Sequence, residues 1–275
     1  MKKIIILGKN SYIGSSLKEY LCRFTDKYCV DVISTNGLKP DQSHFLSYNV
    51  AVCVAGVAHI KETQKNRELY YRINRDLVIE MARSAKNAGV KQFVLLSSMS
   101  VYGLTFGYIT KNSIPHPVNA YGESKLQADE EIRKIENEKF IFTCLRPPMV
   151  YGKNCKGNYQ VLRNIALWSP FFPDYKNKKS MIYIGNLCEF IKNSIDFELN
   201  GIFFPQNSEY VNTSEMVRLI AESHKKNIIF TKKLNRLIDN SQITFINKAF
   251  GNLMYGKDDT IDKYNFKESI LMTEG

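Results

Sequence analysis

The stretch Phe93-Val-Leu-Leu-Ser-Ser-Met-Ser-Val-Tyr-Gly103, followed by Tyr121-Gly-Glu-Ser-Lys125, organises the rest of the chain. Its first four residues are apolar without interruption, which is typical of a parallel strand buried on both faces. Hydroxyl side chains follow at the end of that strand. If residues 121–125 are helical, the i,i+4 spacing puts the phenol of Tyr121 and the ammonium of Lys125 on one face. The cation would then lower the pKa of the phenol, and the stretch contains the parts of a proton-transfer site.

Composition indicates one large globular domain, or a large domain with a small annex, because the chain has 275 residues of which 44% are hydrophobic and 24% charged. No apolar run approaches the roughly 20 residues of a membrane helix. The apolar run that follows Lys2 and Lys3 meets Gly8 after four residues, unlike a signal peptide. We therefore interpret residues 3–7 as a first strand and expect a cytoplasmic protein with no stable membrane insertion.

The six cysteines show neither paired nor metal-type spacing, so we expect free thiols and no metal site. The formal net charge is +11, but the basic residues are scattered and no nucleic-acid-binding motif occurs, so we expect no nucleic-acid partner. An anionic ligand or a membrane surface also suits this charge. Residues 225–257 mix basic and apolar side chains as an interfacial segment does, although ordinary domain structure is the preferred interpretation.

Apolar runs with strand character alternate with segments of helical periodicity. Strands are predicted at residues 3–7, 29–34, 50–59, 93–96, 140–145 and 181–184, and helices at residues 15–24, 70–88, 121–137, 187–197 and 214–224. This alternation predicts an α/β fold with a doubly wound parallel sheet. Between Asn36 and Val50 there is room only for a compressed helix and third strand. We predict a dinucleotide-binding domain at residues 1–150, with 181–200 returning to it, and a smaller substrate domain at 151–275.

A glycine-containing loop, Gly8 to Gly14, lies between the first predicted strand and the first helix. Such a turn offers backbone N–H groups and the positive end of a helix dipole to a pyrophosphate. The usual middle glycine of a Gly-x-x-Gly-x-x-Gly loop is Ser11 here. Taken alone, a structural turn explains this loop nearly as well.

The end of the second predicted strand bears on the choice of nicotinamide cofactor. NAD-binding proteins usually place an acid there to bind the ribose 2′-hydroxyl, whereas this chain has Ser34 and Thr35. Both could donate hydrogen bonds to a 2′-phosphate, and Lys9 could neutralise its charge. We therefore expect a preference for NADP(H). NAD(H) remains the alternative, with Asp31 as the acid if the strand ends earlier.

Four motifs occur together in the order and spacing of a known family: Gly8 to Gly14, Ser98-x-x-Val-Tyr-Gly103, Tyr121-x-x-x-Lys125 and Leu145-Arg-Pro-Pro-Met-Val-Tyr-Gly152. Over roughly the first 190 residues the chain resembles the extended short-chain dehydrogenase/reductases, the NAD-dependent epimerase/dehydratase family. The resemblance implies a Rossmann-type sheet. Within that family, residues 146–159, Phe172-Pro173 and residues 250–253 resemble bacterial capsule and O-antigen reductases, which reduce UDP-4-keto-6-deoxy-N-acetylhexosamines.

By position, the resemblance implies a role for each motif residue. Tyr121 would be the proton donor, Lys125 its partner and a ribose contact, and Ser98 the hydroxyl that holds the reacting oxygen. The implied cofactor-binding residues are Gly8, Lys9, Asn10, Tyr12, Ile13, Gly14, Ser34, Thr35, Ala55, Gly56, Val57, Asn74, Tyr121, Lys125 and Pro147. The implied substrate-binding residues are Ser98, Met99, Ser100, Met149, Asn158 and Lys179.

The expected reaction is reduction of the C4 ketone of a UDP-sugar by NADPH. A 4-epimerase with tightly bound NAD would use the same catalytic residues and remains an alternative. A 4,6-dehydratase would carry an Asp-Glu pair after the hydroxyl residue, where this chain has Met99-Ser100. A regulator that binds cofactor without chemistry would have no need for Ser98, Tyr121 and Lys125 together. The oligomeric state, a homodimer included, stays open.

Overall fold

The computed structural model describes the whole chain except residues 59, 61, 240–243 and 262. His59, the last residue of one predicted strand, therefore lies outside the described residues. The chain forms two compact units. Unit 1 comprises residues 1–103, 114–147 and 188–205, and unit 2 comprises residues 104–113, 148–187 and 206–275.

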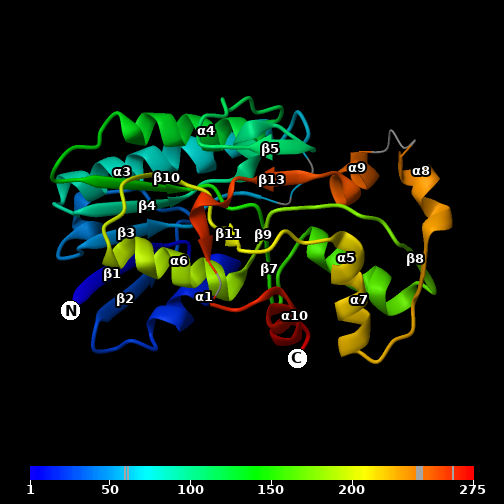
Figure 1. Ribbon diagram of the computed structural model, residues 1–275. Helices are drawn as coiled ribbons and strands as arrows, with labels where there is room; N and C mark the ends of the chain where they lie inside the picture. The colour runs from blue at the N-terminus through cyan, green and yellow to red at the C-terminus, as the bar shows by residue number, and fades with distance from the viewer. Residues whose placement is uncertain (59, 61, 240–243, 262) are drawn as a thin grey trace. The chain divides into compact units, whose positions relative to one another are not determined.

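Unit 1 is built on a parallel sheet of six strands in the order β10-β6-β4-β3-β1-β2. The strands are β1 (Lys2–Leu7), β2 (Tyr28–Ile33), β3 (Val50–Cys53), β4 (Gln92–Leu96), β6 (Ile141–Leu145) and β10 (Gly201–Phe203). Helices α3 (Leu77–Asn87) and α4 (Ala120–Arg133) lie on one face, and α1 (Tyr12–Leu21) and most of α6 (Ile184–Asp196) on the other (Figure 1). The predicted doubly wound α/β fold is confirmed.

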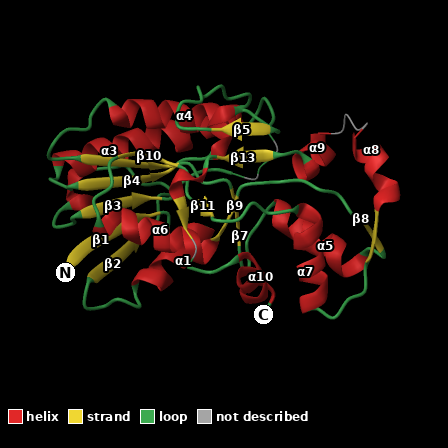
Figure 2. Ribbon diagram, viewed as in Figure 1, coloured by secondary structure: helices red, strands yellow, loops and turns green. Residues whose placement is uncertain are grey.

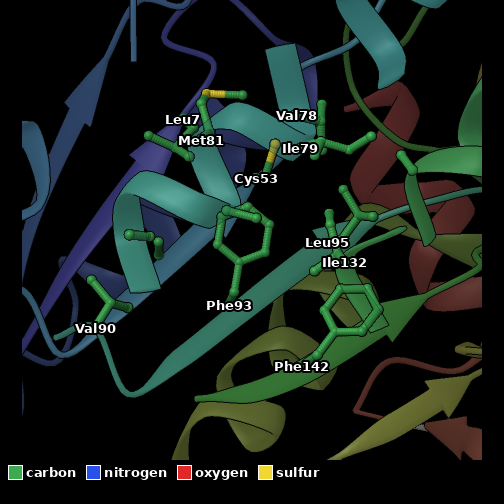
Figure 3. Close-up of a cluster of buried hydrophobic side chains, with 14 of the residues drawn as sticks. Leu7, Cys53, Val78, Ile79, Met81, Val90, Phe93, Leu95, Ile132 and Phe142 are labelled. Carbon is green, nitrogen blue, oxygen red and sulfur yellow. The ribbon is translucent and has the colours of Figure 1, made fainter. Parts of the chain in front are cut away.

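The core between the sheet and helices α3 and α4 explains why the central strands are continuously apolar. Figure 3 shows Leu7, Cys53 and Phe93 from the strands meeting Val78 and Met81 from α3. These five side chains are fully buried. The helical residues recur at intervals of three and four, as a helix with one buried face requires.

Unit 1 departs from the predicted elements in its strands. Residues 36–49 contain a single turn of 3-10 helix, η1 (Gln42–Phe45), and no strand, which leaves β2 at the edge of the sheet. These fourteen residues are too few for a helix, a strand and their connections. The strand predicted at residues 181–184 forms as β9 (Met181–Tyr183), but it pairs with β7 (Met149–Tyr151) in unit 2. The sixth strand of the large sheet is β10, which pairs with β6.

The predicted helix 70–88 is interrupted. The structure has α2 (Arg67–Tyr71), a π-helical turn η2 (Arg72–Asp76) and then α3. An extra residue in a π-turn rotates the side chains that precede it relative to those that follow. The apolar periodicity of residues 73–85 does not reveal this turn, because the helix continues on both sides of it.

Unit 2 consists of short parallel strand pairs and helices (Figure 2). The pairs are β7 with β9, β8 (Phe171–Pro173) with β12 (Ile229–Thr231), β5 (Gly107–Ile109) with β13 (Leu253–Tyr255), and β11 (Gln206–Asn207) with β14 (Thr260–Ile261). The helices are α5 (Asn158–Trp168), α7 (Thr213–Ser223), α8 (Asn235–Asp239), α9 (Thr244–Phe250) and α10 (Phe266–Glu274). Helix α7 packs against both α5 and α10. In the described parts of both units, no helix combines the length and the apolar composition that crossing a bilayer requires.

Candidate active site

The loop between β1 and α1 ends in a helix cap built by Ser11. Its side-chain oxygen accepts a hydrogen bond from the backbone N–H of Gly14 at 2.9 Å. The residue that departs from the glycine motif therefore stabilises the start of α1. The first turn of this ten-residue helix carries no acidic side chain. The positive end of its dipole suits a phosphate.

Lys125 lies one turn into α4, and its side chain reaches the carboxyl ends of two strands. The ammonium donates to the carbonyl of Leu96 at 2.8 Å and to that of Ala55 at 3.4 Å. The residue is only 4% exposed. A Cβ atom on Gly56 would stand 3.0 Å from the Lys125 nitrogen and 3.1 Å from the side-chain oxygen of Asn74, so the chain passes close to both side chains at this point. A buried cation held by carbonyl dipoles is thereby placed at the edge where parallel sheets bind ligands.

Asn74 is fully buried within the π-helical turn η2. Its side-chain oxygen accepts from the N–H of Val57 at 2.7 Å, and its amide donates to the Val57 carbonyl at 3.1 Å and to the hydroxyl of Ser124 at 3.3 Å. The side chain thus joins the segment after β3 to helix α4. π-turns of this kind are frequent at functional sites.

Tyr121 is the second residue of α4, whose first turn is capped by the side chain of Asn119. The Tyr121 ring packs edge-on against Tyr70, with ring centroids 6.3 Å apart. Tyr121 and Lys125 both lie in α4, four residues and hence about one helical turn apart.

The hydroxyl turn after β4 packs against the same end of α4. Ser98 caps the 3-10 helix η3 (Met99–Tyr102), accepting from the N–H of Ser100 at 3.1 Å. A Cβ atom on Gly122 would lie 2.5 Å from the carbonyl oxygen of Ser100, so this approach of turn and helix requires glycine. The carbonyl of Pro147 accepts from the N–H of Met99 at 3.0 Å and holds the other side of the turn. Ser98, Tyr121, Lys125 and Pro147 are thus all attached to one corner of unit 1.

A buried polar cluster behind this corner is not predicted from the motifs. Asp129 accepts from the Arg146 guanidinium at 3.0 Å and from the Ser97 hydroxyl at 2.9 Å, and Arg146 also donates to the hydroxyl of Tyr102 at 2.9 Å. Burial raises the pKa of the Asp129 carboxyl, and Arg146 and Ser97 oppose that shift. The sequence does hold a signal, because Asp129 follows Lys125 by four residues and so continues the Tyr121–Lys125 face of the helix.

The end of β2 bears on the choice of cofactor. The strand ends at Ile33, and Ser34 and Thr35 follow, with Ser34 exposed. Asp31, the alternative acid, lies inside the strand and accepts a hydrogen bond from the hydroxyl of Tyr48 at 2.8 Å. The acid usual in NAD-binding proteins is therefore absent from the residues that directly follow this strand.

The remaining predicted substrate residues belong to unit 2. Met149 lies in β7, and Asn158 is the exposed first residue of α5. Lys179 donates to the carbonyls of Lys248 at 2.8 Å and Gly251 at 3.4 Å, at the carboxyl end of α9. Burial lowers the pKa of the Lys179 ammonium to about 8. This cation is therefore held by carbonyl dipoles at a helix end, an arrangement that also stabilises the helix.

Comparison with known proteins identifies relatives of the chain. The sequence profile described as "NAD dependent epimerase/dehydratase family" matches residues 4–189. A UDP-glucose 4-epimerase of Vibrio cholerae is 26% identical over 95% of this chain and 85% of its own length. An N-acetyl-α-D-glucosaminyl-diphospho-ditrans,octacis-undecaprenol 4-epimerase of Escherichia coli O157:H7 is 25% identical over 82% of this chain and 73% of its own length.

Solved structures share the fold. The dTDP-4-dehydrorhamnose reductase of Bacillus anthracis, in complex with NADP, superposes with a TM-score of 0.69. The match covers 86% of each chain at 20% sequence identity. This likeness extends beyond the six-stranded sheet to most of the chain.

Proposed function

The chain belongs to the NAD dependent epimerase/dehydratase family, a family of nucleotide-sugar enzymes, and on this premise we propose that it is an NADPH-dependent 4-ketoreductase. Its substrate would be a UDP-4-keto-6-deoxy-N-acetylhexosamine destined for a capsule or O-antigen polysaccharide. The observation that carries this proposal is the corner of unit 1 where the Ser98 turn packs on the helix that bears Tyr121 and Lys125. Met99 and Ser100 provide no carboxylate for a dehydration.

The residues present fit a nicotinamide dinucleotide. The start of α1, from Gly8 to Gly14, offers N–H donors for the pyrophosphate. The small residues Ala55 and Gly56 leave space beside Lys125, whose ammonium would bind the ribose. Ser34 and Thr35, with Lys9, would hold a 2′-phosphate. When bound, the cofactor supplies the hydride.

Tyr121 would give its proton to the oxygen that gains negative charge as the ketone is reduced. The ammonium of Lys125, kept in place by the carbonyls of Leu96 and Ala55, would stabilise the charge left on the phenol. Ser98 would donate a hydrogen bond to the same substrate oxygen. Preorganised donors of this kind cost little reorganisation during the reaction and commonly provide a large part of catalysis.

The family resemblance implies further residues that would bind the sugar nucleotide. Met99 and Ser100 would contact the sugar next to Ser98. Asn158 would contribute a hydrogen bond and Met149 an apolar surface. Lys179 would contribute positive charge for the diphosphate. Its ammonium has three N–H donors, and two carbonyl oxygens accept from it, so a further donor can serve the diphosphate.

A second candidate function is 4-epimerisation of a UDP-N-acetylhexosamine with tightly bound NAD. Both curated relatives reported above are named 4-epimerases, which favours it. One of them is named for an undecaprenol-linked sugar, so a lipid-linked N-acetylhexosamine is a further substrate to test. The end of β2, which has no acid at residues 34 and 35, favours NADPH and hence the reductase.

The deciding experiment offers the purified protein the product of a UDP-GlcNAc 4,6-dehydratase together with NADPH or NADH. We expect NADPH oxidation by the native protein, a loss of several orders of magnitude for Tyr121→Phe with NADPH binding retained, and no change for the matched control Tyr108→Phe. If neither cofactor is oxidised, the reductase is wrong. Bound NAD in the purified protein and interconversion of UDP-N-acetylhexosamine epimers would establish the epimerase instead.

A further inference from the structure

Three large apolar side chains of unit 2 are exposed around the strand pair β8 and β12. Trp168 is 83% exposed, Phe171 53% and Ile229 59%. In the register of the two strands, Phe171 and Ile229 are direct partners, so they lie side by side on one face. Trp168 ends helix α5 three residues before Phe171, and the connection is held by the Ser169 hydroxyl, which donates to the Phe171 carbonyl at 2.6 Å. We refer to Trp168, Phe171 and Ile229 as the apolar patch.

The folding of unit 2 does not explain these exposed positions. Along β8 the neighbouring side chain, Phe172, points the other way and is buried, with ring centroids 6.1 Å from Phe230 and 5.7 Å from Phe250. Phe172 therefore supplies the core contact of the strand, whereas Phe171 adds none. Large apolar side chains that gather in water usually mark a surface that binds something.

The segment that contains β12 has a strong charge bias. Residues 225–236 hold five basic side chains, all exposed, and no acidic one: Lys225, Lys226, Lys232, Lys233 and Arg236. They stand on both sides of Ile229 along the chain. The apolar patch is thus flanked by positive charge, next to α5 and α7 (Figure 1).

We propose that the apolar patch and its flanking lysines dock unit 2 onto an anionic phospholipid bilayer. Tryptophan and phenylalanine favour the boundary between headgroups and acyl chains, and lysines gain free energy near anionic headgroups. Four of the five cations are lysines. A lysine ammonium is a point charge on a flexible stem, and it needs no fixed partner geometry, which suits the many headgroups of a bilayer. The planar guanidinium of arginine is better suited to paired contacts with a single carboxylate. This docking goes beyond the proposed reaction and does not depend on it.

The chain carries a reporter of this docking, because Trp168 is its only tryptophan. The full-length protein is mixed with phosphatidylcholine vesicles with or without phosphatidylglycerol, at about 0.1 M salt. We expect a blue shift of tryptophan emission, quenching by brominated lipid and co-sedimentation with the phosphatidylglycerol vesicles only. Unchanged emission together with protein left in the supernatant overturns the proposal.

Two sets of variants keep the reporter and separate the two contributions. Phe171→Ser with Ile229→Ser should weaken partitioning by roughly tenfold. Changing Lys225, Lys226, Lys232 and Lys233 to Gln should remove the dependence on phosphatidylglycerol. The control Phe197→Ser changes an aromatic of unit 1 that is 74% exposed, more than Phe171 or Ile229, and should bind like the native protein.

Circular dichroism serves as the control for folding of each variant. Turnover of a soluble substrate should stay unchanged in all of them. Failure of docking with intact turnover would leave the proposed reaction untouched. Self-association without lipid that is lost in Phe171→Ser with Ile229→Ser would show that a second copy covers the patch, and would overturn the membrane proposal.

Discussion

Asp129 and Arg146 form an ion pair inside unit 1, with 3.0 Å between carboxylate and guanidinium and neither side chain more than 4% exposed. The Ser97 hydroxyl binds the same carboxylate oxygen. The pair therefore connects helix α4 to the ends of β4 and β6. Lys125 and Tyr121 lie one and two turns earlier on that helix, so the ion pair helps to hold the part of α4 that carries them against the ends of these strands.

The first prediction concerns the free energy of unfolding when this pair is broken. Asp129→Asn leaves the Arg146 charge buried without its counter-ion and should destabilise the protein by about 3–5 kcal/mol in urea unfolding. The double variant Asp129→Asn with Arg146→Met should recover part of the loss. As the control, Glu131→Gln removes an exposed partner of Lys134 on the same helix and should change the free energy of unfolding little, because solvent screens the pair. Equal effects of Asp129→Asn and Glu131→Gln would mean that the pair does not hold the helix.

The second prediction concerns the choice of cofactor. Thr35→Asp places a carboxylate after β2, where it would repel a 2′-phosphate and accept a hydrogen bond from a ribose 2′-hydroxyl. The ratio of kcat/KM for NADPH to that for NADH should fall by at least about tenfold, equivalent to roughly 1.4 kcal/mol. Thr35→Asn, similar in size but neutral, is the matched control and should change the ratio little. A native protein that already prefers NADH would contradict the assignment.

The third prediction concerns the pH dependence of substrate binding through Lys179. Its ammonium, with a pKa that burial lowers to about 8, carries full charge below that pH and loses it above. If it binds the diphosphate, kcat/KM should fall as pH rises through about 8, mainly through KM. Lys179→Arg keeps its charge and should flatten that fall, whereas Lys178→Gln, an exposed neighbour, should leave the profile unchanged. A profile that is identical in the native protein and in Lys179→Arg would assign Lys179 to the end of α9 alone.

The sequence predicts the elements whose signal is local. Residues 93–96 and 141–145 are strands because an apolar run without charges is stable only inside a sheet covered on both faces. The helix predicted at residues 121–137 is present as α4, which ends four residues earlier, at Arg133. Ser11 stands where the motif usually has its middle glycine and so weakens the match to the pattern. In the structure the same serine caps α1, a role that the motif alone does not predict.

The features that sequence does not predict depend on contacts between distant residues. Whether residues 181–183 or 201–203 complete the large sheet depends on which strand edge each can reach, and both segments are short. The spacing of Lys125 and Asp129 places Asp129 on the Tyr121–Lys125 face of the helix, but its partner Arg146 follows β6, 17 residues later, and only the fold brings the two side chains together. The π-turn at residues 72–76 is not visible in the apolar periodicity, because helix continues on both sides of it, and the bonds of the Asn74 side chain to Val57 form only in the folded chain.

The last prediction concerns the acid stability of unit 2, through Glu274 near the end of α10. Its carboxylate side chain is 1% exposed and accepts hydrogen bonds from Arg163 at 2.7 Å, Tyr159 at 2.7 Å and His224 at 2.6 Å. Burial by itself would raise the pKa of Glu274, but the bonds from these three side chains outweigh it and lower the pKa below its ordinary value of 4.5. A carboxylate with a lowered pKa in the folded state contributes stability above its unfolded pKa, and that stability is lost as pH falls through the folded value.

Glu274→Gln should therefore reduce the free energy of unfolding at pH 7 by about 1.5–3 kcal/mol. It should also make the decline of stability below about pH 4.5 shallower, measured by urea unfolding across a pH series. Glu222→Gln, an exposed residue of α7, is the control and should reproduce the native decline, whereas a native-like decline in Glu274→Gln would show that these bonds do not control the acid unfolding of unit 2.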